Sequence, residues 1–166
     1  FQPGQRSKRM LDDAQWDFPG ATAIPFRADV TPANPTSVYG ATKLAQEHII
    51  SAWALSFGTD VAILRLQNVY GAGQSLDNPY TGIVSLFSRL AKAKQSIPLY
   101  EDGLMRRDFV YISDVARAVL AATKEAAAVG RVYDIGYGLP STIKDLADQL
   151  ARHYGAPAPH VCGMYR

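Results

Sequence analysis

The sequence has almost no cysteine, little histidine and no long apolar run. Cys162 is the only cysteine among the 166 residues, which excludes an internal disulfide and a thiolate metal cluster. His48, His153 and His160 show no metal-ligand spacing with a cysteine or with one another, so we expect no metal site. No apolar run approaches the roughly 20 residues that a membrane-spanning helix needs, and no signal peptide is recognisable. We therefore expect a cytoplasmic protein with no membrane partner.

A block of like charge is also missing. The formal net charge is +2, and the longest basic run is the short stretch Arg6–Arg9, "RSKR", which is typical of a solvated loop. The charge pattern therefore gives only weak support for a nucleic-acid partner, and we expect none. With 48% hydrophobic and 19% charged residues, the chain has the composition of a soluble globular domain.

Helical and strand patterns alternate after an irregular beginning. Residues 1–35 have little periodicity and five prolines, and we expect them to be an irregular arm, the tail of an insertion in a longer protein. Residues 36–166 form the predicted domain. Helices are predicted over 36–57, 82–94, 113–124 and 141–154. Ser113 or Asp114 is expected to cap the third helix, and Ser141 the fourth. Strands are predicted over 61–66, 97–100, 107–112 and 132–136, and residues 67–82 are predicted to be loop. This alternation indicates an α/β fold with at least partly parallel strands.

Two apolar segments carry predictions about burial. The strand "VAILRL", Val61–Leu66, is a continuous apolar run, which favours burial on both faces. Trp53 and Phe57 stand at helical spacing, and we expect them to pack in the core or in an interface.

A tyrosine and a lysine stand four residues apart in the predicted first helix. Residues at i and i+4 lie on the same helical face, so Tyr39 and Lys43 point the same way. A lysine ammonium beside a phenol stabilises the phenolate, which makes a tyrosine a usable proton acceptor near neutral pH. A Tyr-x-x-x-Lys pair also arises by chance, so the pair alone leaves a plain surface interpretation open.

Four motifs that occur in a fixed order are more specific than the Tyr-x-x-x-Lys pair alone. "SVYGATKLAQEH", "LRLQNVYGAGQ", "IPLYEDGLMRRDFVYISDVARAV" and "VYDIGYG" follow one another along the chain. Together they resemble the extended short-chain dehydrogenase/reductases of the NAD-dependent sugar-nucleotide epimerase/dehydratase family. The resemblance implies a partial doubly wound, Rossmann-like parallel sheet that includes the substrate-binding region. The Gly-x-x-Gly-x-x-Gly run by which that family holds its dinucleotide occurs nowhere in the sequence, so we expect the N-terminal dinucleotide-binding half to be absent.

The resemblance also implies roles around the cofactor. Tyr39 would be the catalytic acid/base, and Lys43 would hydrogen-bond the nicotinamide ribose. Gln67 would lie near the nicotinamide, although a solvent-facing glutamine remains the alternative. The implied cofactor is NAD, with NADP left open.

A second group of residues would bind the sugar nucleotide. By resemblance, Asn68 contacts the diphosphate or the sugar, Arg107 grips the diphosphate, Tyr100 packs against the base, and the loop Asn78 to Ile83 surrounds the sugar. Each has a structural alternative. Arg107 could pair with Asp102 or Asp108. Asn68 could be a turn residue, and Tyr100 could be a half-buried strand aromatic.

The resemblance favours one reaction and leaves two alternatives. The implied activity is a 4-epimerase that removes and returns hydride through a 4-keto sugar, and the run "RLQNVYGAGQSLDNPYTGI" is most similar to the dTDP-rhamnose 4-epimerase subgroup. The alternatives are a dehydratase of the same family and a catalytically silent binding or structural fragment, which is what we expect of the 166 residues in isolation. We expect the parent enzyme to be a homodimer. Asp134 departs from the family pattern, which has asparagine there.

Overall fold

The computed structural model describes residues 4–76 and 82–165. The helices are α1 (Lys8–Asp12), α2 (Val38–Phe57), α3 (Ile83–Lys92), α4 (Ile112–Ala122) and α5 (Ile143–Tyr154), with one 3₁₀ turn, η1 (Ala126–Ala128). The strands are β1 (Ile63–Leu66), β2 (Asn68–Tyr70), β3 (Pro98–Leu99), β4 (Arg106–Arg107), β5 (Phe109–Tyr111), β6 (Val132–Ile135), β7 (Ser141–Thr142) and β8 (His160–Val161). The mixed α/β class predicted from the sequence is confirmed.

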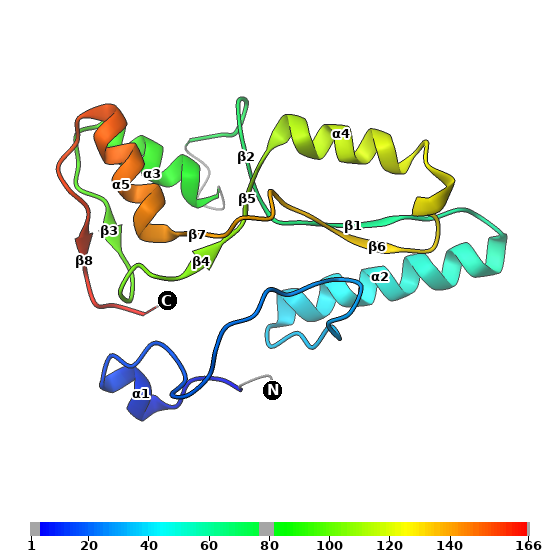
Figure 1. Ribbon diagram of the computed structural model, residues 1–166, viewed down its shortest axis with the longest axis horizontal. Helices are drawn as coiled ribbons and strands as arrows, with labels where there is room; N and C mark the ends of the chain where they lie inside the picture. Colours follow the sequence, from blue (N-terminus) through cyan, green and yellow to red (C-terminus); the bar gives the residue numbers. More distant parts are fainter. Residues whose placement is uncertain (1–3, 77–81, 166) are drawn as a thin grey trace.

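Two parallel strand pairs form the centre of the molecule. β1 pairs with β6 in register from Ile63 opposite Val132 to Leu66 opposite Ile135, and β2 pairs with β5. Figure 1 shows α2 on one side of the β1–β6 pair and α4 on the other. This helix–sheet–helix order is the layering of a doubly wound fold.

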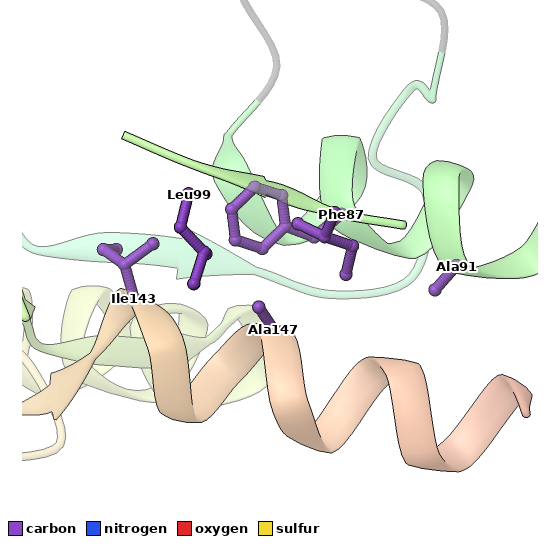
Figure 2. Packing of buried hydrophobic residues seen from close by; sticks show 6 residues of the cluster. Phe87, Ala91, Leu99, Ile143 and Ala147 are labelled. Carbon is purple, nitrogen blue, oxygen red and sulfur yellow. The ribbon is translucent and has the colours of Figure 1, made fainter. Parts of the chain in front are cut away.

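The largest cluster of buried residues lies in a second group of elements at one end of the molecule. There α3 packs against α5 beside β3, and the apolar side chains of these elements interlock (Figure 2). The buried cluster consists of Phe87, Ala91, Ile97, Leu99, Ile143 and Ala147. β3 is extended by parallel pairing with β8, and β4 by antiparallel pairing with β7. The largest buried cluster of the described residues therefore lies in this lobe, and next to it Val110 on β5 and Val115 on α4 are also buried.

The prediction that Val61–Leu66 is buried on both faces is wrong. Its residues are half-buried, and Leu66 is 51% exposed. Among the described residues β1 has one hydrogen-bonded neighbour, β6, and the elements packed on its two faces cover it only in part. The helix facing it, α2, has no buried residue.

Trp53 and Phe57 do not enter the core. They contact each other, with ring centroids 5.3 Å apart, and remain 50% and 70% exposed. Ile49 and Leu55 on the same helix are also exposed. α2 therefore presents a broad apolar surface, because its apolar residues exceed what the neighbouring strands cover.

Two segments expected to lack regular structure contain some. Residues 68–70, placed in the predicted loop 67–82, form strand β2. The arm contains the short helix α1, whose N-cap Ser7 accepts a hydrogen bond from the amide of Met10. The predicted strand 107–112 is divided instead of continuous, because Asp108 separates β4 from β5 and bonds elsewhere.

The predicted helix caps are displaced by one to three residues. Tyr111 precedes α4 without a side-chain cap, and Asp114 forms a salt bridge with Arg117 within the first turns. The cap of α5 is Thr142 instead of Ser141, and it forms a capping box with Asp145. The hydrogen bonds that Thr142 donates to Asp145 lower the pKa of this carboxyl.

Within the ranges that the structure describes, no helix is long and apolar enough to cross a membrane. The same ranges contain no group of three or more His, Cys, Asp or Glu side chains that could hold a metal ion.

Candidate functional site

Tyr39 and Lys43 stand at the beginning of α2 and line one cavity together. Ser37 caps this helix by accepting a hydrogen bond from the amide of Gly40, so the first turns are fixed. The ammonium of Lys43 lies 5.9 Å from the centroid of the Tyr39 ring, and it donates a hydrogen bond of 3.2 Å to Oε1 of Gln46. Tyr39 is 72% exposed, which leaves its phenol open to a ligand.

The cavity beside this pair has a volume of about 740 Å³. It is bounded by α2, by β1 and by the arm residues Phe26 and Ala33 to Pro35. α2 begins at the end of the sheet where β1 terminates (Figure 1). The carboxyl ends of parallel strands are where doubly wound folds bind their ligands, so the pair lies on the expected side of the sheet.

A second cavity, of about 950 Å³, runs along β6 from Arg131 to the turn that follows this strand. Its walls include Gln67, Arg106 and Asp108, together with arm residues 23–29. Phe26 lines both cavities, which makes them neighbours on the two sides of the arm. The amide of Gln67 donates to the carbonyl of Ile135 at 2.9 Å, which fixes Gln67 at the carboxyl ends of both strands.

The carboxylate of Asp108 holds the turn that follows β6. It accepts hydrogen bonds from the amides of Tyr137 at 2.8 Å and Gly138 at 2.9 Å. A side chain at Gly136 would stand 2.8 Å from Cγ of Asp108 and 3.0 Å from Cγ of Gln67. Glycine is therefore favoured at 136, because the Asp108 carboxylate approaches its backbone closely.

Arg107 does not form either ion pair considered from the sequence. Its guanidinium instead donates to the carbonyl of Arg106 and to Sδ of Met105, both at 2.8 Å. Asp108 is bonded to the turn after β6, and Asp102 accepts from the amide of Leu104. Arg107 is exposed, so its guanidinium can turn toward a ligand, while its neighbour Arg106 lines the larger cavity.

The remaining predicted residues are distributed over both parts of the molecule. Asn68 is the first residue of β2 and not a turn residue, and its amide donates to the carbonyl of Asp108 at 3.0 Å. Ile83 opens α3 and packs against the buried cluster. Tyr100 follows β3 and is 47% exposed. Asn78 lies outside the described residues. In the structure Tyr39 therefore lies beside Lys43, and Asn68 is hydrogen-bonded to Asp108. Ile83 and Tyr100 belong to the α3–α5 lobe.

Sequence reasoning missed a group of charged residues that links α2, the strands β1 and β6, and the arm. Arg65 on β1 makes two hydrogen bonds of 2.8 Å to the carboxylate of Glu47 on α2. These bonds lower the pKa of Glu47 and raise that of Arg65. Asp134 stands opposite Arg65 on β6 and accepts from the amide of Ala28 at 2.6 Å. The one available signal was an arginine inside an apolar strand, because such a residue needs a partner.

Asp134 therefore has a structural role. Its carboxylate faces the arm and accepts the Ala28 amide, and its negative charge acts on Arg65. An asparagine would keep the hydrogen bond but lose the charge.

Comparisons with known proteins bear on the family and on the fold. The NAD dependent epimerase/dehydratase family matches residues 18–136. A dTDP-L-rhamnose 4-epimerase from Burkholderia thailandensis is 58% identical over 164 residues, which cover 99% of this chain and 45% of that protein.

Solved structures of epimerases have a fold similar to that of this chain. UDP-glucose 4-epimerase from Thermotoga maritima, in a structure with UDP-glucose, has a TM-score of 0.74 and 29% identity over 80% of this chain and 42% of its own. UDP-glucose 4-epimerase from Thermus thermophilus, in complex with NAD, has a TM-score of 0.70 and 29% identity over 87% of this chain and 45% of its own. The chain spans less than half the length of each of these relatives.

Proposed function

The chain belongs to the NAD dependent epimerase/dehydratase family, and from this premise we propose that the whole protein is an NAD-dependent enzyme that inverts carbon 4 of a nucleotide-activated sugar. The observation that supports this most directly is the pairing of Tyr39 with Lys43 on one face of α2, beside an open cavity at the carboxyl ends of parallel strands. Identity of 58% to a dTDP-L-rhamnose 4-epimerase favours dTDP-L-rhamnose as the substrate.

We propose that Lys43 and Gln67, at this end of the sheet, hold the nicotinamide end of NAD. Lys43 offers an ammonium donor to ribose hydroxyls, and Gln67 offers an amide at the carboxyl end of β1. NAD supplies the hydride acceptor and donor. The printed sequence has no glycine run for the pyrophosphate, so this chain accounts for only part of a dinucleotide site.

In the proposed reaction Tyr39 moves the proton. Its phenol oxygen accepts the proton of the sugar 4-hydroxyl as that carbon is oxidised, and returns it after the opposite face of the sugar is reduced. Lys43 stands one helical turn from Tyr39, with its ammonium 5.9 Å from the centroid of the Tyr39 ring. Asn68 and Arg107 would hold the diphosphate and sugar, and Tyr100 would pack against the base.

Product analysis of the whole protein tests this function. We expect dTDP-L-rhamnose to be converted to its 4-epimer with no change in mass, as followed by nuclear magnetic resonance and mass spectrometry. A product lighter by one water from a dTDP-hexose would instead identify a dehydratase, which is the alternative within the family. Absence of turnover on every nucleotide sugar offered would refute the proposal.

The 166-residue chain by itself should be catalytically silent. Tyr39 and Lys43 can contact the ribose, but no Gly-x-x-Gly-x-x-Gly is present for the diphosphate. We expect titration of the purified chain with NAD to give no tight binding. Binding as tight as that of the whole protein would contradict this expectation.

We also propose that the whole protein is a homodimer. Ile49, Trp53 and Phe57 leave an exposed apolar surface on α2, and surfaces of this kind commonly mark interfaces. Sedimentation equilibrium of the whole protein should therefore give twice the monomer mass, and a monomer at micromolar concentration would contradict the proposal.

A further inference from the structure

Glu101 is an acidic residue in a position that physically disfavours one. Only 5% of its surface is exposed, and burial of a carboxylate is unfavourable unless it is paired. Its φ of +55° lies in the left-handed region, which glycine adopts far more readily than glutamate. A residue that violates two preferences at once needs a compensating contact, and that contact is made by its side chain.

The partner of Glu101 is Arg6, which lies 95 positions earlier in the arm. Nη2 of Arg6 stands 2.7 Å from Oε1 of Glu101. The guanidinium carbon of Arg6 also lies 5.7 Å from the ring centroid of Trp16, and Nη1 donates to the Trp16 carbonyl at 3.5 Å. We call Arg6, Trp16 and Glu101 the arm latch. Figure 1 shows the blue arm with α1 beside the end of the molecule that carries β3 and β4.

The interpretation of the stretch "RSKR" as a solvated loop is wrong for its first residue, Arg6. The side chain of Arg6 is only 24% exposed, whereas that of Arg9 is 92% exposed. Arg9 forms an i,i+4 pair with Asp13 at 3.5 Å on the surface of the same arm. One arginine of the run therefore holds the arm to the domain, and the other provides a matched control.

The latch acts on the segment that joins two of the predicted nucleotide-binding residues. Tyr100 immediately precedes Glu101, and Arg107 follows at the end of β4. The remainder of this segment is held by other elements. The amide of Glu101 donates to the carbonyl of Met164 at 2.7 Å, and the carbonyl of Gly103 accepts from the amide of Lys144 at 2.9 Å. Arg6 supplies the side-chain contact at Glu101, next to Tyr100.

We propose that Arg6 and Glu101 are positioning residues that fix the segment 100–107 for binding the nucleoside diphosphate part of the substrate. This rests on the proposed function, because it takes Tyr100 and Arg107 as nucleotide contacts. The arm latch holds the backbone next to Tyr100 through Glu101. Neither Arg6 nor Glu101 touches the ligand.

The test is the binding of dTDP and of NAD by the whole protein and its variants. In Arg6→Gln we expect the Kd for dTDP to rise about 3- to 30-fold, the range for residues that act on a site without contacting its ligand. The Kd for NAD should stay unchanged, because the cofactor lies at α2. Arg9→Gln should bind both ligands like the wild type. Arg6→Lys should restore part of the dTDP affinity, since it keeps the charge but not the planar fork.

A second variant removes the risk that Arg6→Gln fails to fold. Glu101→Gly keeps the backbone hydrogen bond to Met164 and suits the positive φ, so its fold should be retained while the latch is lost. We expect weaker dTDP binding in this variant, together with faster amide hydrogen exchange over residues 100–107. Affinity for dTDP equal to that of Arg9→Gln would overturn the proposal.

The two proposals fail in different ways. Wild-type protein that binds dTDP but converts no nucleotide sugar would refute the epimerase assignment and leave the latch to be decided by the variants. Wild-type protein that does not bind dTDP would overturn the latch as a nucleotide-positioning device. A parallel rise in the Kd values of dTDP and NAD would also overturn it, because it would indicate a general loss of structure.

Discussion

Replacement of Gly136 by alanine tests how the turn after β6 is held at the candidate site. The new methyl group would overlap the Asp108 carboxylate and stand 2.8 Å from its Cγ. Asp108 would have to move, which breaks its hydrogen bonds to the amides of Tyr137 and Gly138. Hydrogen bonds to charged groups contribute about 1.5 to 3 kcal/mol each, and since these are open to solvent we take the lower limit, ~3 kcal/mol for both.

Part of this loss of stability is offset, because alanine lowers the conformational entropy of the unfolded chain. Alanine restricts the unfolded chain relative to glycine and stabilises by about 0.4 to 1 kcal/mol where its conformation is allowed. The net prediction for Gly136→Ala is therefore a loss of roughly 2 kcal/mol in the free energy of unfolding. Gly4→Ala is the matched control, because no atom lies within 4 Å of the position of a side chain there.

The assay is urea denaturation of a double-mutant cycle. Asp108→Ala alone should cost ~3 kcal/mol through the same two hydrogen bonds. If the methyl group acts by displacing the aspartate, the double variant should be no less stable than Asp108→Ala, whereas independent effects would add to roughly 5 kcal/mol. Additive losses would refute the reasoning that Gly136 is glycine because of Asp108.

Three further predictions follow from other contacts. Thr142→Ala should lower the free energy of unfolding by about 1 kcal/mol in urea denaturation, because it removes the side-chain half of the capping box with Asp145; no change would show that α5 does not need this cap. Arg65 lowers the folded-state pKa of Glu47. The wild type should therefore be more stable to unfolding than Glu47→Gln above pH ~4.5, and this difference in stability should disappear as the pH falls through the folded-state pKa. Urea midpoints of both proteins from neutral pH to about pH 3 measure the difference, and a difference that does not change with pH would contradict the prediction. Arg107→Ala should weaken sugar-nucleotide binding by about 1.5 to 3 kcal/mol in calorimetry, since the guanidinium is expected to grip the diphosphate; an unchanged Kd would return Arg107 to a structural role.

Elements with strong periodicity were predictable from the sequence, because their signals are local. The helix around Tyr39 has apolar residues at helical steps, a preceding proline and a following glycine, and α2 ends at Gly58 in the left-handed conformation. The pair with Lys43 follows from helix geometry alone. The strand Val132–Ile135 was equally visible as a β-branched and aromatic run.

Features that depend on distant partners were not predictable. β2 has only three residues within a stretch rich in glycine and asparagine, and it forms because β5 lies beside it. The weak burial of α2 and β1 depends on what covers them, and a periodic pattern does not record this. The arm latch joins residues 95 positions apart, and nothing local to Glu101 indicates a left-handed backbone or a buried carboxylate.

The central claim is that Tyr39 carries the proton in sugar epimerisation, and the Tyr39→Phe variant of the whole protein tests it most directly. A phenyl ring fills the same space without an exchangeable proton, so substrate affinity should stay within several-fold of the wild type. Turnover of dTDP-L-rhamnose should fall below detection. Turnover that persists at a comparable rate in Tyr39→Phe would contradict the account.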